Sequence, residues 1–221
     1  MADKTAGNRQ KGQLSKSRVV EAAIRLADKD GIAALTMRKL AQSLGVEAMS
    51  LYHHLPNKDA MLGAMVDQIF AEISPPPEGK PWKDAISARA GSAREVLMRH
   101  PWAVQVLETR RNPGTITLSH HDAVIGCFRR AGFTVALAAH AYSLIDSYIY
   151  GFVMQETTLP FKTGEEAHAV AEQILQGLPE EQYPHLAEMT RELVLKPGYA
   201  YSNEFEFGLE LILDGLEAAL T

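Results

Sequence analysis

The chain has 221 residues; 46% of them are hydrophobic and 22% are charged, an ordinary composition for a globular protein that excludes a disordered or fibrous one. The length predicts one large domain, or a small domain joined to a larger one. No apolar run approaches the roughly 20 residues of a bilayer span, and the N-terminus lacks a signal-peptide core, so we expect a cytoplasmic protein. The single cysteine, Cys127, excludes an intrachain disulfide and a multi-thiolate metal site.

The net charge of −5 is unevenly distributed along the chain. Residues 1–58 carry ten Lys/Arg against five Asp/Glu, a net charge of +5, whereas residues 59–221 carry twelve against twenty-two, a net charge of −10. A basic N-terminal quarter is typical of a chain whose first part binds a polyanion. A solvated positive face without a partner would give the same imbalance, so charge alone leaves both interpretations open.

The first part of the chain predicts a polar arm followed by four helices. Residues 1–14 have no apolar period and are expected to form the arm. Helical spacing of apolar residues then begins after Ser15 or Ser17 and stops at Gly31. Thr36 is a second N-cap candidate, and its helix stops at Gly45. A third short helix covers EAMSLYHHL, and a fourth runs from Lys58 to about residue 73.

The rest of the chain predicts helices only, after a breaker-rich linker at 74–81. We place the domain boundary here, with a first domain over 1–73 and a second over 74–221. The expected helices of the second domain, separated by Pro and Gly breaks, are 82–99, 101–109, 116–131, 134–156, 165–177, 184–195 and 203–220. The predicted fold class is therefore all-α. No phosphate loop, metal spacing or nucleophile elbow is present, so we expect neither catalytic residues, nor a metal, nor a cofactor.

Two short helices joined at Gly45 have the spacing of a helix-turn-helix, whose second helix enters the major groove of DNA. Glycine tolerates the positive φ of a tight turn, and the small Ala41 permits close approach of the crossing helices. An apolar seam is expected to lock these helices against the first one: Leu40, Leu44, Val46 and Leu51. The third helix then presents its outer side chains beside Arg38, Lys39 and Lys58, which suits a groove bounded by phosphates. A plain three-helix bundle is the alternative, because Ala-x-x-x-Gly alone is common.

These residues resemble the DNA-binding region of the TetR family of transcriptional repressors, through the segments RKLAQ, LGVE, LY-x-H and NK. FEFGLELILDGLE, with Trp82 and Gly132-Phe133, is similar to the C-terminal domain of the tetracycline repressors, so the likeness covers most of the chain. The resemblance implies an all-helical, dimeric regulator controlled by a small ligand. It places the DNA contacts on Thr36, Arg38, Ala48, Met49, Ser50, Tyr52, His53, His54 and Lys58.

The DNA contacts fall into two chemical groups. Arg38 is expected to contact a guanine edge or the nearest phosphate, and Thr36, Tyr52 and Lys58 are expected to hold phosphates. Ala48, Met49 and His53 depart from the tetracycline repressors; apolar groups at the first two favour thymine methyls and predict a different operator. His53 and His54 point about 100° apart on a helix, so they are not expected to share a metal ion.

Two apolar helices of the second domain, 134–156 and 203–220, are expected to pair with their copies in a homodimer. The last helix is predicted to bury one face, made by Phe205, Leu209, Ile212, Leu216 and Ala219 and widened by Leu211, Leu213 and Leu220. A domain core within one subunit would also explain both helices. We favour the dimer, because a two-fold symmetric operator fits a small reading head.

An effector cavity is expected among the central helices. Its candidate lining residues are His100, Trp102, Gln105, His121, Tyr142, Asp146, Tyr148, Met154 and Gln155. Each aromatic residue or Met could equally belong to the core, and Asp146 could also be an interface or solvent-facing residue. Alignment anchored at Thr109-Arg110 places the metal-binding His of the tetracycline repressors on Val106 or Leu107. Alignment without gaps from Gly132-Phe133 places their metal-binding Glu on Gln155, and other drug contacts fall on Arg89 and Ala93. These residue types predict that magnesium-tetracycline is not the effector.

The sequence thus predicts a ligand-responsive repressor that binds a palindromic DNA operator as a homodimer and is released by a small-molecule effector. An activator or an effector-independent DNA-binding protein is the first alternative. An enzyme using the central histidines with Asp122 or Asp146 is the second, although neighbouring helical residues such as His120, His121 and Asp122 diverge.

Overall fold

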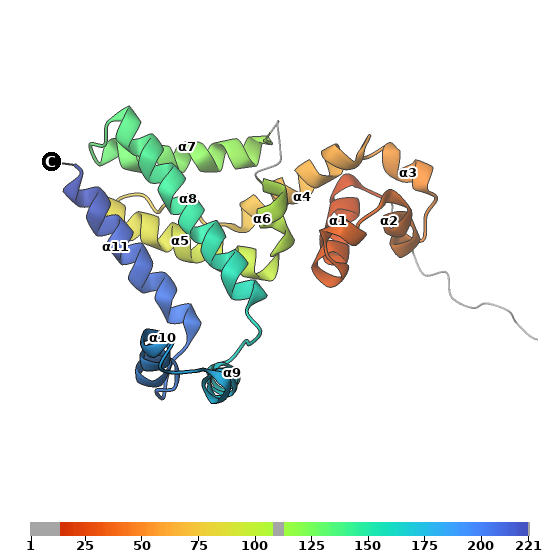
Figure 1. The fold of residues 1–221 in the computed structure, drawn as a ribbon. Helices are drawn as coiled ribbons and strands as arrows, with labels where there is room; N and C mark the ends of the chain where they lie inside the picture. The colour runs from red at the N-terminus through yellow and green to blue at the C-terminus, as the bar shows by residue number, and fades with distance from the viewer. Residues whose placement is uncertain (1–13, 108–112, 221) are drawn as a thin grey trace, which may run out of the picture.

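The computed structural model describes residues 14–107 and 113–220, and this part of the chain is made of helices with no β-strand (Figure 1). The predicted all-α class is therefore confirmed. The expected arm, the end of the 101–109 helix, Thr109-Arg110 and Thr221 lie outside the described residues. Within them, no helix is long and apolar enough to cross a membrane.

The first four α-helices form an N-terminal unit, which we call the head: α1 (Lys16–Asp30), α2 (Met37–Leu44), α3 (Ala48–Tyr52) and α4 (Lys58–Glu72), with a short 3-10 turn, η1 (Ile32–Ala34), between α1 and α2. Ser15 caps α1, since its side chain accepts the Arg18 N–H at 3.2 Å. Thr36 caps α2 in the same way through the Lys39 N–H at 3.1 Å. Both predicted caps are therefore confirmed.

The turn between α2 and α3 depends on Gly45, which adopts a left-handed conformation at φ 67°. The backbone N–H of Val46 then reaches the carbonyl of Ala41 at 3.1 Å and closes the end of α2. Leu40 and Leu51 from the two sides of the turn are both 0% exposed, and Leu44 and Val46 pack partly buried beside them. The predicted seam is thus present, and it fixes the angle between α2 and α3.

The long helix α4 leads out of the head. Asn57 caps its start by accepting the Ala60 N–H at 2.7 Å. Its buried face carries Met61, Met65 and Ile69, and the helix packs against α1 near the head and against α7 further along. The head and the helices that follow α4, which we call the body, therefore share one continuous apolar core.

The body is a bundle built from α5 (Trp82–Arg99), α6 (Trp102–Leu107), α7 (Thr115–Arg130), α8 (Val135–Thr158) and α11 (Glu204–Ala218). In Figure 1, α8 crosses the centre of this bundle with α11 beside it, and α8 packs on α5, α7 and α11. A central position on three neighbours explains why α8 is apolar nearly all round.

The last helix buries only part of the predicted face. Phe205, Leu209 and Leu216 are buried as expected, together with Leu213, which was predicted to widen the face, while Ile212 is only half-buried. Ala219 is exposed, because the helix has ended at Ala218. Every third or fourth residue of α11 thus faces α5 and α8, and Leu211 is left 58% exposed.

A distal arm extends from the lower end of the bundle in Figure 1 and consists of α9 (Gly164–Gly177), α10 (Pro184–Met189) and η2 (Thr190–Val194), followed by the 3-10 turn η3 (Tyr201–Asn203). Thr163 and Glu166 form a capping box at the start of α9. The single helix predicted over 184–195 is wrong in one respect: it changes to a π-helical turn at Thr190, whose hydroxyl donates to the Leu186 carbonyl at 2.8 Å. Ala167, Ala171 and Ala187 are buried in this arm, apart from the main core.

Candidate functional site

The outer surface of α2 and α3 carries most of the predicted DNA contacts in exposed positions. Thr36, Arg38, Met49, Tyr52, His53 and Lys58 are exposed, with Met49 72% exposed; Ala48, Ser50 and His54 are half-buried. Because Leu51 anchors α3 to the core, the residues on either side of it are turned toward solvent. Arg38, Lys39 and Lys58 form no ion pair within residues 14–107 and 113–220, so their charges are available to phosphates.

A polar junction ties the end of the head to the body. The carboxylate of Asp28, at the end of α1, accepts hydrogen bonds from His100 Nδ1 at 2.7 Å and from Trp102 Nε1 at 2.6 Å. Beside it, Arg99 donates to Glu72 of α4 at 2.7 Å. We call these five residues the junction. His100 and Trp102 were expected to line a cavity; the structure places them here instead, because their polar atoms find a partner on α1.

A cavity of about 330 Å³ lies where α4, α7 and α8 meet. It is lined by Val66, Phe70, Leu107, Pro113, Thr117, His121, Tyr142 and Tyr150. The rings of Phe70 and Tyr142 both meet the edge of the His121 ring, with centroids 5.8 and 5.4 Å away. The volume lies within the range of small-molecule pockets, and the lining is mainly apolar and aromatic. Two expected residues, His121 and Tyr142, are therefore part of this cavity.

A buried polar network lies behind the cavity. Arg89, 1% exposed, donates to Asp146 at 2.5 Å and to His120 Nε2 at 3.2 Å. Burial, together with the neighbouring guanidinium of Arg89, lowers the pKa of His120 to about 4, so its imidazole is neutral and accepts the Arg89 hydrogen. Burial and the Asp146 carboxylate raise the pKa of Tyr150, which keeps its phenol protonated. Asp146 was expected in the cavity lining; it lies one layer deeper and is held as the counter-ion of Arg89.

A tertiary cap joins α4 to α7 at one edge of the cavity. Asp67 of α4 accepts both the hydroxyl of Thr117 at 2.7 Å and its backbone N–H at 3.4 Å. The second carboxylate oxygen lies so close to Gly114 that a Cβ there would collide with it. A carboxylate at the start of a helix also meets the positive end of the helix dipole. Asp67 thus takes the place of the N-cap side chain that Gly114 lacks.

The four other expected effector residues lie away from the cavity. Gln105 and Met154 are exposed, because each points outward from its helix. Tyr148 turns toward α11, where its hydroxyl donates to the backbone carbonyls of Glu204 and Phe205 at 3.1 and 3.0 Å. Gln155 accepts a hydrogen bond from Tyr201 at 2.6 Å. Their spacing placed them on the right helices but not on the faces that surround the cavity.

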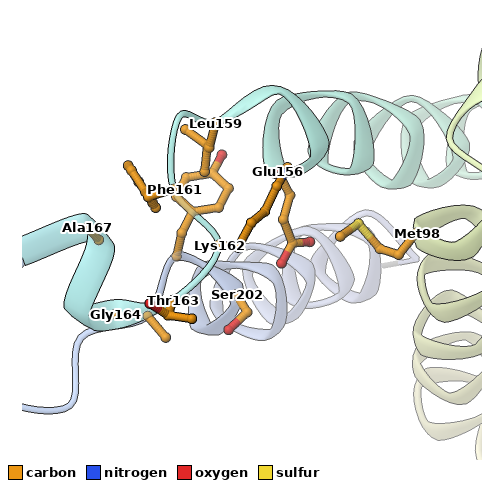
Figure 2. Close-up of a pocket in the computed structure, with 11 residues that line it drawn as sticks. Met98, Glu156, Leu159, Phe161, Lys162, Thr163, Gly164, Ala167 and Ser202 are labelled. Atoms are coloured by element: carbon orange, nitrogen blue, oxygen red, sulfur yellow. Dashed lines mark hydrogen bonds between the residues drawn. The ribbon is translucent and has the colours of Figure 1, made fainter. Parts of the chain in front are cut away.

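A second, smaller hollow of about 100 Å³ lies between the end of α8 and the start of α9 (Figure 2). Glu156, on its wall, is paired with Arg94 through hydrogen bonds of 2.6 and 3.0 Å. Lys162 is also engaged, since its Nζ donates to the Thr157 carbonyl at 2.9 Å. The charged groups of this hollow therefore have partners within the chain, and its volume is too small for a drug-sized ligand.

Sequence reasoning did not include Asp67, Thr117 and Tyr150 among the effector residues. Arg89 was placed at a drug-contact position by the alignment, but its buried ion pair was not predicted. Its periodicity could have indicated that pair, because Arg89 falls among the buried positions Ala85, Ile86, Ala90 and Ala93 of α5. An arginine on an apolar helical face requires a buried acid as partner. No comparable signal marks Thr117, whose partner lies on another helix. Among the described residues, no three His, Cys, Asp or Glu side chains converge as a metal site would require.

A helix-turn-helix head on a larger helical body with a central cavity defines the class of helical transcriptional regulators. Two family models match the chain: "Bacterial regulatory proteins, tetR family" over residues 19–65, and "Tetracyclin repressor-like, C-terminal domain" over residues 74–220. The chain belongs to the TetR family of transcriptional regulators, which are not enzymes.

The relatives agree with this assignment. The chain is 37% identical over 151 residues to an HTH-type transcriptional regulator of Saccharopolyspora erythraea, a match covering 68% of this chain and 64% of that protein. It is 31% identical over 216 residues to the transcriptional repressor DrrR1 of Streptomyces coeruleorubidus, covering 94% and 78%. Among solved structures, ActR of Streptomyces coelicolor in complex with actinorhodin has a TM-score of 0.79 and 26% identity, covering 94% of this chain and 97% of ActR.

Proposed function

We propose that this regulator is a repressor that binds a palindromic operator as a homodimer and leaves it when a small molecule enters the cavity of α4, α7 and α8. Residues 1–73 would form the DNA-binding domain and residues 74–221 the effector-binding and dimerisation domain. The related ActR binds actinorhodin, which supports a small-molecule effector for this chain.

One observation carries this proposal: α4 belongs to the head and to the cavity at once. It packs against α1, and it contributes Val66 and Phe70 to the cavity wall. A ligand that changes the spacing between α4 and α7 would therefore change the tilt of the head. Coupling of this kind requires only that the ligand binds one tilt more tightly than the other.

The dimer proposal rests on exposed large apolar side chains of two helices that pack against each other. Leu144 and Met154 of α8 are 46% and 50% exposed, and Phe207 and Leu211 of α11 are 62% and 58% exposed. Exposed large apolar side chains on neighbouring helices favour an interface there. A second copy related by a two-fold axis would bury these side chains and set two heads at a fixed spacing for successive major grooves.

Light scattering after size exclusion tests the dimer. We expect about twice the chain mass of 24.3 kDa for the wild type, and about one chain mass for a Phe207→Glu/Leu211→Glu variant. Leu118→Glu is a matched control, because Leu118 is also an exposed leucine, at 51%, but lies on α7. A wild-type protein that stays monomeric at micromolar concentration would refute the homodimer.

Selection from random DNA tests operator binding. We expect a palindromic sequence, and we expect Arg38→Ala to reduce affinity for it about 10-fold or more, since a bidentate base contact contributes about 1–3 kcal/mol. Arg191→Ala, which removes an exposed arginine of the distal arm, should leave the affinity unchanged. Unselective, strongly salt-dependent binding would instead support an effector-independent DNA-binding protein. A promoter fused to the selected operator distinguishes repression from activation.

A further inference from the structure

Of the three hydroxyl groups that described residues contribute to the cavity wall, from Thr117, Tyr142 and Tyr150, two donate their hydrogen away from the cavity, to carboxylates. Thr117 Oγ1 donates to Asp67 at 2.7 Å, and Tyr150 donates to Asp146 at 3.3 Å. A hydroxyl has one hydrogen and two lone pairs. What these two groups can still offer a ligand is therefore hydrogen-bond acceptors.

The direction of both hydrogen bonds is fixed by the other partners of the carboxylates. Asp67 receives the backbone N–H of Thr117 on the same oxygen that receives the Thr117 hydroxyl, so this oxygen is an acceptor. The other oxygen of Asp146 accepts a hydrogen bond from the guanidinium of Arg89 at 2.5 Å, so both oxygens of this carboxylate act as acceptors. Neither hydroxyl can reverse its bond without leaving a carboxylate oxygen unsatisfied in a buried place.

The charges of the described residues around the cavity do not favour an anionic ligand. The described lining residues include no lysine or arginine, and the buried guanidinium of Arg89 behind them is paired with Asp146. The carboxylate of Asp67 stands at its edge, bound to Thr117. The aromatic part of the wall, formed by Phe70, His121 and Tyr142 with their rings edge to face, leaves space suited to a flat ring.

We propose that the cavity recognises its effector through hydrogen-bond donors of the ligand: it binds an uncharged aromatic molecule whose phenolic hydroxyl donates to Thr117 Oγ1 or Tyr150 Oη. This inference rests on the cavity being the effector site and specifies the chemistry that it selects. Blocking the ligand hydroxyl with a methyl group removes the donor. Replacing it with a carboxylate adds a charge that no described lining residue compensates.

Calorimetric titration of the full-length protein with 2-naphthol, 2-methoxynaphthalene, naphthalene and 2-naphthoate tests the proposal. We expect 2-naphthol to bind about 3- to 10-fold more tightly than 2-methoxynaphthalene or naphthalene, the size of one hydrogen bond, and 2-naphthoate to bind most weakly. Equal affinities for 2-naphthol, its methyl ether and naphthalene would overturn the proposal. So would tighter binding of 2-naphthoate, or an absence of binding by all four compounds.

Two variants locate the acceptor. Tyr150→Phe and Thr117→Val each remove one hydroxyl with little change in volume, and in the double variant the preference for 2-naphthol should disappear while naphthalene still binds. Tyr148→Phe is the matched control, because it removes a phenol of the same helix that donates to α11 instead. Circular dichroism checks that each variant is folded. A preference for 2-naphthol that survives in the double variant would overturn the assignment.

An operator-binding measurement in parallel keeps this inference distinct from the proposed function. Fluorescence anisotropy of labelled operator DNA reports release when a naphthalene probe is added. Donor-dependent binding without release would support the recognition chemistry and count against the switch. Release that is equally effective with 2-naphthol and 2-methoxynaphthalene would support the switch and overturn the recognition chemistry.

Discussion

The buried pair of Arg89 and Asp146 gives the sharpest prediction about stability. Arg89 is 1% exposed and Asp146 is 6% exposed, so neither charge is compensated by water. Arg89→Met leaves Asp146 with one hydrogen bond, from Tyr150 at 3.3 Å. Removing one partner of a buried ion pair typically costs about 3–5 kcal/mol, because the other charge stays buried and unpaired. With a urea m-value of about 2 kcal/mol/M, the unfolding midpoint should fall by about 1.5–2.5 M.

The double variant Arg89→Met/Asp146→Leu should be more stable than either single variant, because it removes both charges together. Urea unfolding followed by circular dichroism, at one fixed protein concentration, measures all three. Lys196→Met is the control, since Lys196 pairs with Glu192 at 3.1 Å on the surface and should change the free energy of unfolding by less than about 1 kcal/mol. If Arg89→Met costs less than about 1 kcal/mol, or if the two single effects simply add, the pair is not coupled as described.

Three further predictions concern neighbouring sites. Folding lowers the pKa of His120 from 6.5 to about 4, so the unfolded chain binds more protons than the folded chain between these pH values. The free energy of unfolding should therefore fall by about 2 kcal/mol as the pH drops from about 6.5 to about 4. His120→Gln should flatten this pH dependence in urea titrations. Gly114→Ala should displace Asp67 and destabilise the protein by about 1–3 kcal/mol. Gly91→Ala is the control and should stabilise the protein slightly, because a Cβ added there meets no atom within 4 Å. Thermal melting compares the two variants, and equal melting points would contradict the tertiary cap. Trp102→Phe removes the 2.6 Å bond to Asp28 and should cost about 1–2 kcal/mol and alter operator affinity in anisotropy titrations; unchanged values for both would show that the junction is not coupled to the head.

Local features of the fold were predictable from the sequence because they depend on neighbours in the chain. Ser15, Thr36 and Gly45 act as the caps that their residue types favour, and the helices begin and end close to the predicted residues. The change to a π-helical turn at Thr190 was not predictable from the apolar period, which continues through it. The positions of the helices relative to one another were not predictable either, because the apolar period describes each helix by itself.

The candidate cavity was predictable only in part, because its chemistry depends on pairs of residues on different helices. Aromatic spacing selected His121 and Tyr142, and both line the cavity. It also selected His100 and Trp102, since nothing in the local sequence shows that both bond to Asp28, more than 70 residues earlier. Tyr150 was missed because its importance comes from Asp146 and, through it, from Arg89 of another helix.

The junction has a practical consequence for exchanging DNA-binding domains between relatives. A fusion made at the breaker-rich linker 74–81 looks safe from the sequence, but it separates Asp28 and Glu72 from His100, Trp102 and Arg99. The carboxylates of a transplanted head would not match the hydrogen-bond donors of the body. A hybrid sensor could then still bind its own promoter and yet lose its response to the inducer. Grafts that carry all five side chains together would preserve the link between the two halves.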